Sequence, residues 1–150
     1  MTVLSSYVTT THHSCAEIYA RWADPATWSD WDPEVASVRF EGPAIVGARG
    51  RLTPASGPAQ AFIISTLRPD REFTNRAALP GAHLEFEHLV EPDPAGSRIC
   101  VTVRVHGALR PLWARILRRP LGPAARLSVT GLLAALPEAR GHTLCERMEP

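Results

Sequence analysis

The chain has 150 residues, of which 45% are hydrophobic, and a formal net charge of +1 at pH 7. This composition is typical of one globular domain with a sizeable core, and it argues against intrinsic disorder. No segment approaches the ~20 apolar residues of a membrane span. The N-terminus has no basic region followed by an apolar core, so we expect no secretory signal.

The cysteines and histidines give no metal-binding pattern. Cys15, Cys100 and Cys145 lie far apart with no Cys-x-x-Cys pair, which disfavours zinc sites and disulfide frameworks and favours a cytoplasmic protein. His12 and His13 are adjacent, so their side chains do not readily face one ion, and we expect both in solvent. We therefore expect no metal and no cofactor.

The first elements are predicted to be a strand and a helix. Val3–Thr10 is rich in β-branched residues, which favour strands. Ser14 and Glu17 form a capping-box pattern, in which the serine caps the helix and the glutamate bonds back to the serine amide. The helix that they open is predicted to run through Trp22.

A short aromatic turn follows in the stretch Asp24–Pro33. Aspartate is a good helix cap, and Pro25 suits the first helical position because that residue needs no amide hydrogen. Pro33 ends the turn, because the residue before a proline is pushed out of the α region. Trp28 and Trp31 then share one face, and we expect them to pack as a structural plug.

Six alternating segments, separated by turn residues that include proline and in most cases glycine, predict antiparallel strands. They are Val35–Glu41, Ala48–Pro54, Gln60–Leu67, Glu72–Leu79, His83–Glu91 and Arg98–His106. After Gly107 the apolar period becomes helical. The segment Pro120–Pro123 is predicted to split or kink this helix. We expect a single domain with a core of about residues 3–138 and a loose tail, residues 139–150.

Strand, two short helices, six strands and a long helix form an α+β arrangement. The chain also contains the motifs Trp28-x-x-Trp31-x-Pro33, Phe86-Glu87-His88 and Gly107-Ala108-Leu109-x-Pro111-Leu112-Trp113. With these motifs, the order of elements resembles that of the polyketide cyclase/dehydrase and lipid-transport family of the START-like (SRPBCC) helix-grip superfamily. The resemblance implies a helix-grip fold: a curved antiparallel sheet of about seven strands wrapped around a long C-terminal helix. It also implies an internal cavity for lipids, sterols, polyketides or other apolar molecules.

Strand alternation assigns side chains to the concave face. The candidate ligand-binding residues are Phe62, Ile64, Thr66, Phe73, Asn75, Phe86, His88, Val101 and Val103 from the strands, with Trp113 and Leu132 from the helix. Glu85 and Glu87 are expected to face water. A mainly apolar surface with a few polar groups is the usual form of a small-molecule site.

His88 is the tentative catalytic candidate, because histidine transfers protons near neutral pH and a buried imidazole needs hydrogen-bond partners. Three roles are open: a core histidine bonded to Asn75 or to a helix carbonyl, a ligand contact, or an acid–base catalyst.

The C-terminal part of the chain is strongly basic. No acidic residue occurs between Asp93 and Glu138, whereas arginines are frequent. Arg115, Arg118 and Arg119 are either a solvated helix face or a rim that attracts anions, such as a carboxylate, a phosphopantetheine phosphate or an acyl carrier protein. Nucleic acid is disfavoured because the net charge is near zero. Peripheral membrane contact is open, because the same arginines flank apolar helical residues.

Two functions from different classes follow. The favoured function is binding of a small apolar or amphipathic molecule, because no nucleophile–base pair is visible. The alternative is a cofactor-independent polyketide aromatase/cyclase or dehydratase, as the resemblance implies, in which His88 moves a proton.

Overall fold

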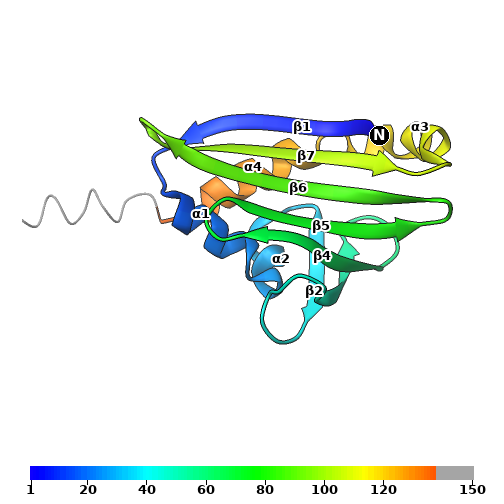
Figure 1. The fold of residues 1–150 in the computed structure, drawn as a ribbon, viewed down its shortest axis with the longest axis horizontal. Coiled ribbons are helices and arrows are strands. Elements are labelled where there is room, and N and C mark those ends of the chain that lie inside the picture. Colours follow the sequence, from blue (N-terminus) through cyan, green and yellow to red (C-terminus); the bar gives the residue numbers. More distant parts are fainter. Residues whose placement is uncertain (138–150) are drawn as a thin grey trace, which may run out of the picture.

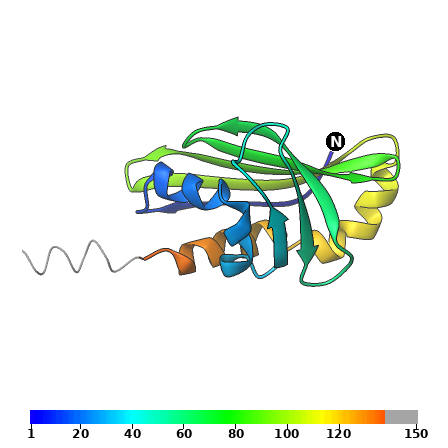
Figure 2. The ribbon, with the colours of Figure 1, turned by 90° about the horizontal axis from the view of Figure 1, so that it is seen from below.

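A curved sheet of seven antiparallel strands forms the framework, and the helices cover its concave face (Figures 1 and 2). The computed structural model describes residues 1–137, so the tail expected at residues 139–150 lies outside the described residues. The elements in chain order are β1 (Thr2–Thr11), α1 (Cys15–Trp22), the 3₁₀ helix η1 (Pro25–Thr27), α2 (Trp28–Trp31), β2 (Val35–Phe40), β3 (Arg49–Pro54), β4 (Gln60–Arg68), β5 (Glu72–Leu79), β6 (Ala82–Asp93), β7 (Gly96–His106), α3 (Arg110–Leu121) and α4 (Ala124–Ala135). The predicted helix-grip fold is confirmed.

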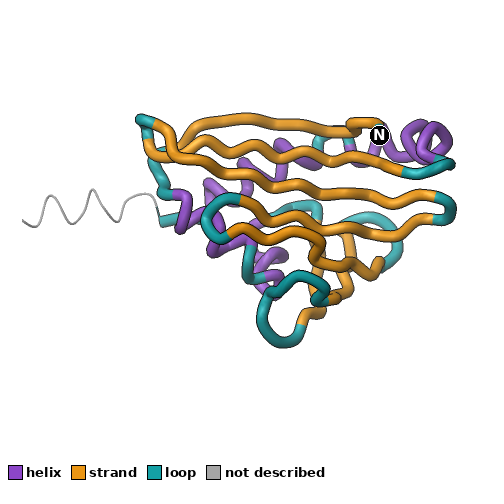
Figure 3. The backbone as a smooth tube through the Cα atoms, in the orientation of Figure 1, coloured by secondary structure: helices purple, strands orange, loops and turns teal. Residues whose placement is uncertain are grey.

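The strand order is β1-β7-β6-β5-β4-β3-β2, so the first strand pairs with the last (Figure 3). This pairing leaves β1 at one edge of the sheet, and both C-terminal helices pack along β1 and β7. At the other edge, β2 and β3 curl toward the helices (Figure 2). Among the described residues, no helix is both long enough and apolar enough to cross a lipid bilayer.

One inward assignment is wrong because β4 contains a bulge. Ser65 is an extra residue without a partner in β5, so Thr66 lies opposite Thr74. An extra residue reverses the alternation of the side chains that follow it. Leu67 therefore lies opposite the buried Phe73 and packs on the core, and Thr66 points to the convex face.

The histidine pair is divided between solvent and core, which corrects a second expectation. His12 is exposed, but His13 is only 4% exposed. The Nδ1 atom of His13 lies 3.1 Å from a carboxylate oxygen of Glu17. The backbone carbonyl of His13 accepts a hydrogen bond from the Ser97 hydroxyl at 2.7 Å. Ser97 belongs to β7, so this contact depends on the tertiary fold.

The predicted aromatic plug is confirmed, since Trp28 and Trp31 are each 6% exposed. The Trp28 indole donates a hydrogen bond to the carbonyl of Trp22 at 3.0 Å. Its ring centroid lies 5.3 Å from that of Phe62 and 5.6 Å from that of Phe73. The short turn thus places the two tryptophan rings in the core.

The C-terminal helix is divided at Gly122 and Pro123, as the proline–glycine segment predicts. At this break the Ser5 hydroxyl of β1 donates to the Gly122 carbonyl at 2.7 Å and accepts from the Ala125 amide at 3.0 Å. Helix ends leave backbone groups without partners, and this one hydroxyl satisfies a group on each side of the break.

Helix α4 approaches α2 closely because residue 131 is glycine. A Cβ atom on Gly131 would overlap the carbonyl oxygen of Trp31 and lie 3.0 Å from the Pro33 ring. The glycine therefore sets the distance between the aromatic turn and the helix that covers the sheet.

Gly131→Ala is expected to destabilise the protein by roughly 1–3 kcal/mol, because α2 and α4 must separate. Alanine ordinarily stabilises a helix interior relative to glycine by about 1 kcal/mol, so the expected sign is reversed. Urea unfolding measures the change. The control is the exposed neighbour Thr130→Ala, for which we expect less than about 0.5 kcal/mol. A more stable Gly131→Ala protein would contradict the close contact.

Ser5→Ala is expected to lower the free energy of unfolding by roughly 1–3 kcal/mol, because the Gly122 carbonyl and the buried Ala125 amide lose their partner. The matched control is Ser6→Ala, since Ser6 is exposed and its hydroxyl lies 3.5 Å from that of Thr102. Equal stabilities of the two variants would show that the hydroxyl does not stabilise the helix break.

Candidate functional site

The concave face carries two apolar clusters. The larger cluster contains Phe62, Ile64, Phe73, Val101 and Leu132 of the predicted site. The smaller cluster contains Val103, with Phe86 and Trp113 packed against it. The structure therefore brings the predicted apolar residues to one face of the sheet but divides them between two groups.

The protein's own aromatic side chains fill much of the larger cluster, in which Trp22, Trp28 and Trp31 are buried. On this face, the predicted residues that remain half-buried are Phe86, His88 and Trp113, and the others are buried. A ligand that enters along the concave face would meet these three side chains first.

His88 lies on β6 among aromatic rings. Its ring centroid is 5.2 Å from that of Trp22 and 6.1 Å from that of Phe73. Its Nδ1 atom lies 2.9 Å from the Phe73 carbonyl oxygen. Because a carbonyl only accepts, Nδ1 carries the hydrogen and Nε2 keeps a lone pair. The partner is therefore a strand carbonyl, and not the Asn75 side chain or helix carbonyl considered from the sequence.

Burial of the imidazole lowers the pKa of His88 to about 4, although the carbonyls of Phe73 and Phe86 act in the opposite direction. Burial disfavours the charged form because it removes water from around the ring. His88 is thus neutral at physiological pH, and its Nε2 atom can accept a hydrogen bond.

Asn75 is a second polar group on the concave face. It lies opposite Phe86 of the neighbouring strand and is 4% exposed. Its Oδ1 atom has no hydrogen-bond partner among the described residues. A buried acceptor without a partner is unfavourable, so a donor supplied by a bound molecule would stabilise this site.

Asp32 is a titratable group that the sequence patterns did not single out as a candidate. Burial raises the pKa of its carboxyl group to about 6, while hydrogen bonds from the Glu34 amide and the Ser128 side chain oppose this rise. The amide bond is 2.9 Å long. Ser128 belongs to α4, so the environment of Asp32 forms only when α4 packs beside the aromatic turn.

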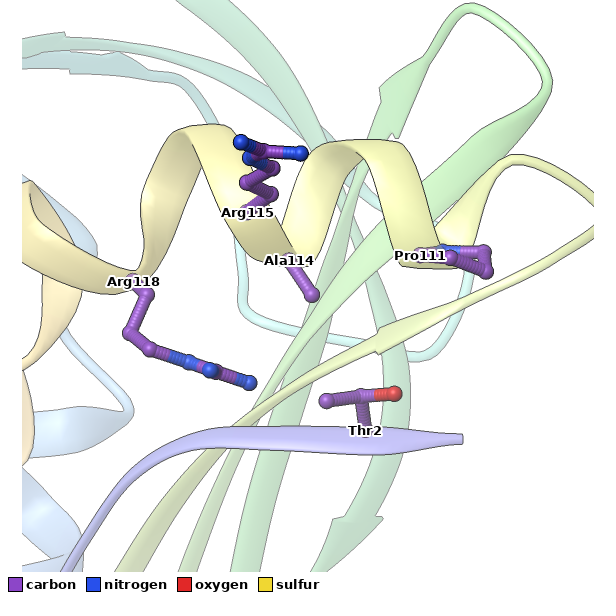
Figure 4. A pocket seen from close by; sticks show the side chains of 5 residues that line it. All are labelled: Thr2, Pro111, Ala114, Arg115 and Arg118. Atoms are coloured by element: carbon purple, nitrogen blue, oxygen red, sulfur yellow. The ribbon is translucent and has the colours of Figure 1, made fainter.

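The predicted rim arginines lie away from the concave face. A surface pocket of about 590 Å³ opens between α3 and the start of β1, lined by Thr2, Pro111, Ala114, Arg115 and Arg118. Arg118 extends across it toward Thr2, whereas Arg115 lies over the helix (Figure 4). Arg119 is exposed on the same helix. A second pocket of about 390 Å³ is lined by Thr10, Thr11, His12, His13, Ala95 and Leu133.

Comparison with known families gives a direct assignment. The family described as polyketide cyclase/dehydrase and lipid transport matches residues 5–138. The chain belongs to this family. A search of curated proteins finds no sequence that matches it.

Solved structures share the fold at low sequence identity. The di-domain aromatase/cyclase StfQ of the steffimycin biosynthetic pathway has a TM-score of 0.73 at 13% identity, over 93% of this chain and 52% of StfQ. The hypothetical protein jhp0584 of Helicobacter pylori has a TM-score of 0.70 at 13% identity, over 87% of this chain and 85% of that one. Ara h 8.0201 has a TM-score of 0.62 at 13% identity, over 86% and 96%. At such identities the similarity establishes the helix-grip architecture alone.

Two buried groups make stability depend on pH in opposite senses. The pKa of His88 is lowered from 6.5 to about 4, so its contribution to stability is lost as the pH falls through that interval. The pKa of Asp32 is raised from 3.8 to about 6, so its contribution is lost as the pH rises through that interval. The two effects oppose each other between about pH 4 and pH 6.

Asp32→Asn is expected to raise the free energy of unfolding at pH 7 by roughly 1–2 kcal/mol and to change it little at pH 4, because asparagine carries no charge to bury. Urea unfolding from pH 4 to pH 7 measures this difference. The control is Asp30→Asn, an exposed aspartate on α2. A uniform change across the pH range would contradict the raised pKa of Asp32.

Proposed function

We propose that the protein binds a small apolar or amphipathic molecule, such as a lipid, a polyketide or an aromatic or isoprenoid compound, on the concave face of its sheet. The observation that carries this proposal is the neutral, half-buried His88 on a mainly apolar surface. Membership of the polyketide cyclase/dehydrase and lipid-transport family supports it. In this proposal, the ligand lies against Phe86 and Trp113, which are the other half-buried residues of the predicted site.

The polar groups of this surface favour a ligand that donates hydrogen bonds. The Nε2 atom of His88 is an acceptor, because Nδ1 carries the hydrogen. The Oδ1 atom of Asn75 is an acceptor without a partner in the described part of the chain. The preferred ligand therefore carries at least one hydroxyl group on an apolar skeleton.

The second candidate function is a polyketide aromatase/cyclase or dehydratase in which His88 acts on a proton. The lone pair on Nε2 favours it, since a general base must be deprotonated at the working pH. In this function the substrate would arrive on an acyl carrier protein, and Arg115, Arg118 and Arg119 would meet its acidic surface.

Binding without catalysis is the better-supported function. A pKa of about 4 makes His88 a weak base. The hydrogen-bond partners of its ring among the described residues are backbone carbonyls, which do not relay protons. An acid–base mechanism normally orients its histidine with a carboxylate or a second titratable group.

Mass spectrometry of molecules that copurify with the native protein identifies the ligand class. A matched pair of probes, 2-naphthol and naphthalene, then tests the requirement for a hydroxyl donor. His88→Leu is expected to weaken 2-naphthol binding by roughly 5–30-fold, because one hydrogen bond is lost, and to leave naphthalene binding within about threefold. His88→Gln is expected to change both affinities modestly, because glutamine keeps a hydrogen-bonding side chain.

The control is His83→Leu, because His83 stacks on His106 on the convex face, with ring centroids 4.9 Å apart. Equal effects of His88→Leu on the two probes, or equal effects of the two histidine variants, would exclude His88 as a ligand contact. For the catalytic alternative, His88→Gln should lower the turnover of a polyketide substrate by roughly 10²–10⁴-fold while binding persists. Turnover that survives this change would exclude His88 as the acid–base residue.

A further inference from the structure

Helix α3 is apolar on two sides. Its inner side packs against the smaller apolar cluster through Trp113, Ala114, Leu117 and Leu121. Its outer side carries Leu112 and Ile116, which are four residues apart and each 51% exposed. Residues at this spacing form one stripe along a helix. We call Leu112 and Ile116 the outer stripe.

An exposed aliphatic stripe on a helix is a sign of a binding surface. Single exposed apolar residues are common on proteins, but contiguous ones mark contacts with proteins, membranes or ligands. The inner side of α3 already supplies the contacts that hold it on the sheet. Packing within the described residues therefore does not account for the outer stripe.

The outer stripe is flanked by unopposed positive charge. Arg115, Arg118 and Arg119 are exposed on the same helix and form no ion pair within the described residues. No acidic residue occurs from residue 94 to residue 137. An aliphatic stripe beside arginines is the pattern of a helix that lies in a membrane interface, where apolar side chains enter the acyl region and cations meet lipid phosphates.

We propose that α3 docks the protein onto a membrane surface that contains anionic lipids. Leu112 and Ile116 would enter the lipid, and the arginines would contact the head groups. The pocket beside the helix supports this assignment, because Arg118 extends across an open space of about 590 Å³ toward Thr2 (Figure 4). A head-group phosphate in this space could accept hydrogen bonds from the Arg118 guanidinium.

The same observations disfavour other partners. A second copy of the chain would bring identical arginine clusters together in a symmetric contact, and like charges repel. The outer stripe is an aliphatic ridge with no aromatic anchor of the kind that is enriched in protein interfaces. Fluid hydrocarbon needs no complementary shape, so a membrane matches this ridge best.

The proposal does not depend on the ligand-binding function, so we test it with protein that carries no added ligand. Co-sedimentation compares vesicles of phosphatidylcholine with vesicles that also contain about 30% phosphatidylglycerol. We expect binding to the anionic vesicles at least about tenfold tighter than to the neutral ones, and a strong decrease at about 0.5 M NaCl. No preference for anionic vesicles would overturn the proposal.

Two variants and two controls locate the contact. Leu112→Ser/Ile116→Ser and Arg115→Gln/Arg118→Gln/Arg119→Gln should each weaken vesicle binding by at least about tenfold. The controls are Ile45→Ser/Val46→Ser, an exposed aliphatic pair in the β2–β3 connection, and Arg39→Gln/Arg49→Gln/Arg51→Gln, exposed arginines of β2 and β3 with the same change in charge. They should keep binding within about twofold of the unmodified protein. Circular dichroism checks that each variant is folded.

Four further results would overturn the proposal. Equal losses in a variant and its control would indicate contact elsewhere or a general attraction of charge. Binding to vesicles that survives Leu112→Ser/Ile116→Ser would show that the outer stripe does not enter the lipid. A change from dimer to monomer in this variant, measured by sedimentation velocity, would assign the stripe to self-association. An acidic protein as the partner would appear as arginine-dependent binding to polyglutamate without binding to vesicles.

Discussion

The packing of aromatic rings around Phe73 is the interaction on which the candidate site depends. Trp28 contacts Phe73 edge to face from the aromatic turn, and His88 contacts it from the next strand. Trp22 covers His88 from α1. These rings shield the imidazole from water, and the reduced hydration keeps the imidazole neutral. The same packing that stabilises the core therefore sets the chemistry of His88 as a hydrogen-bond acceptor.

This arrangement also explains how the fold can keep a site beside a well-filled core. The tryptophans occupy the part of the concave face under α1 and α2, and they leave Phe86, His88 and Trp113 half-buried. A large rigid ring fills volume with little loss of conformational entropy, so the core is stable without contact from a ligand. In the proposed function, specificity depends on the few polar groups at the boundary.

The first strand, β1, contacts both the break of the C-terminal helix and the surface pocket beside α3. Ser5 of β1 holds the break between α3 and α4, and Thr2 lies beside Arg118 at the surface pocket. Because β1 is an edge strand paired with β7, α3 lies at the edge of the sheet. The outer side of α3 therefore does not contact the sheet. The similar solved structures share the architecture at about 13% identity. Their similarity therefore gives no information about surface features of this chain such as the arginines of α3.

The sequence by itself determined the order of the elements, the antiparallel sheet, the Trp28–Trp31 plug and the break of the C-terminal helix. These features follow from local rules: alternation with period two, helical spacing, and the effects of proline and glycine on the backbone. The tertiary structure alone decided the rest. Thr66 turned outward because Ser65 forms a bulge against β5, and the surroundings of Asp32 formed because α4 packs beside it. Register shifts and burial depend on partners distant in sequence, and local patterns contain no information about those partners.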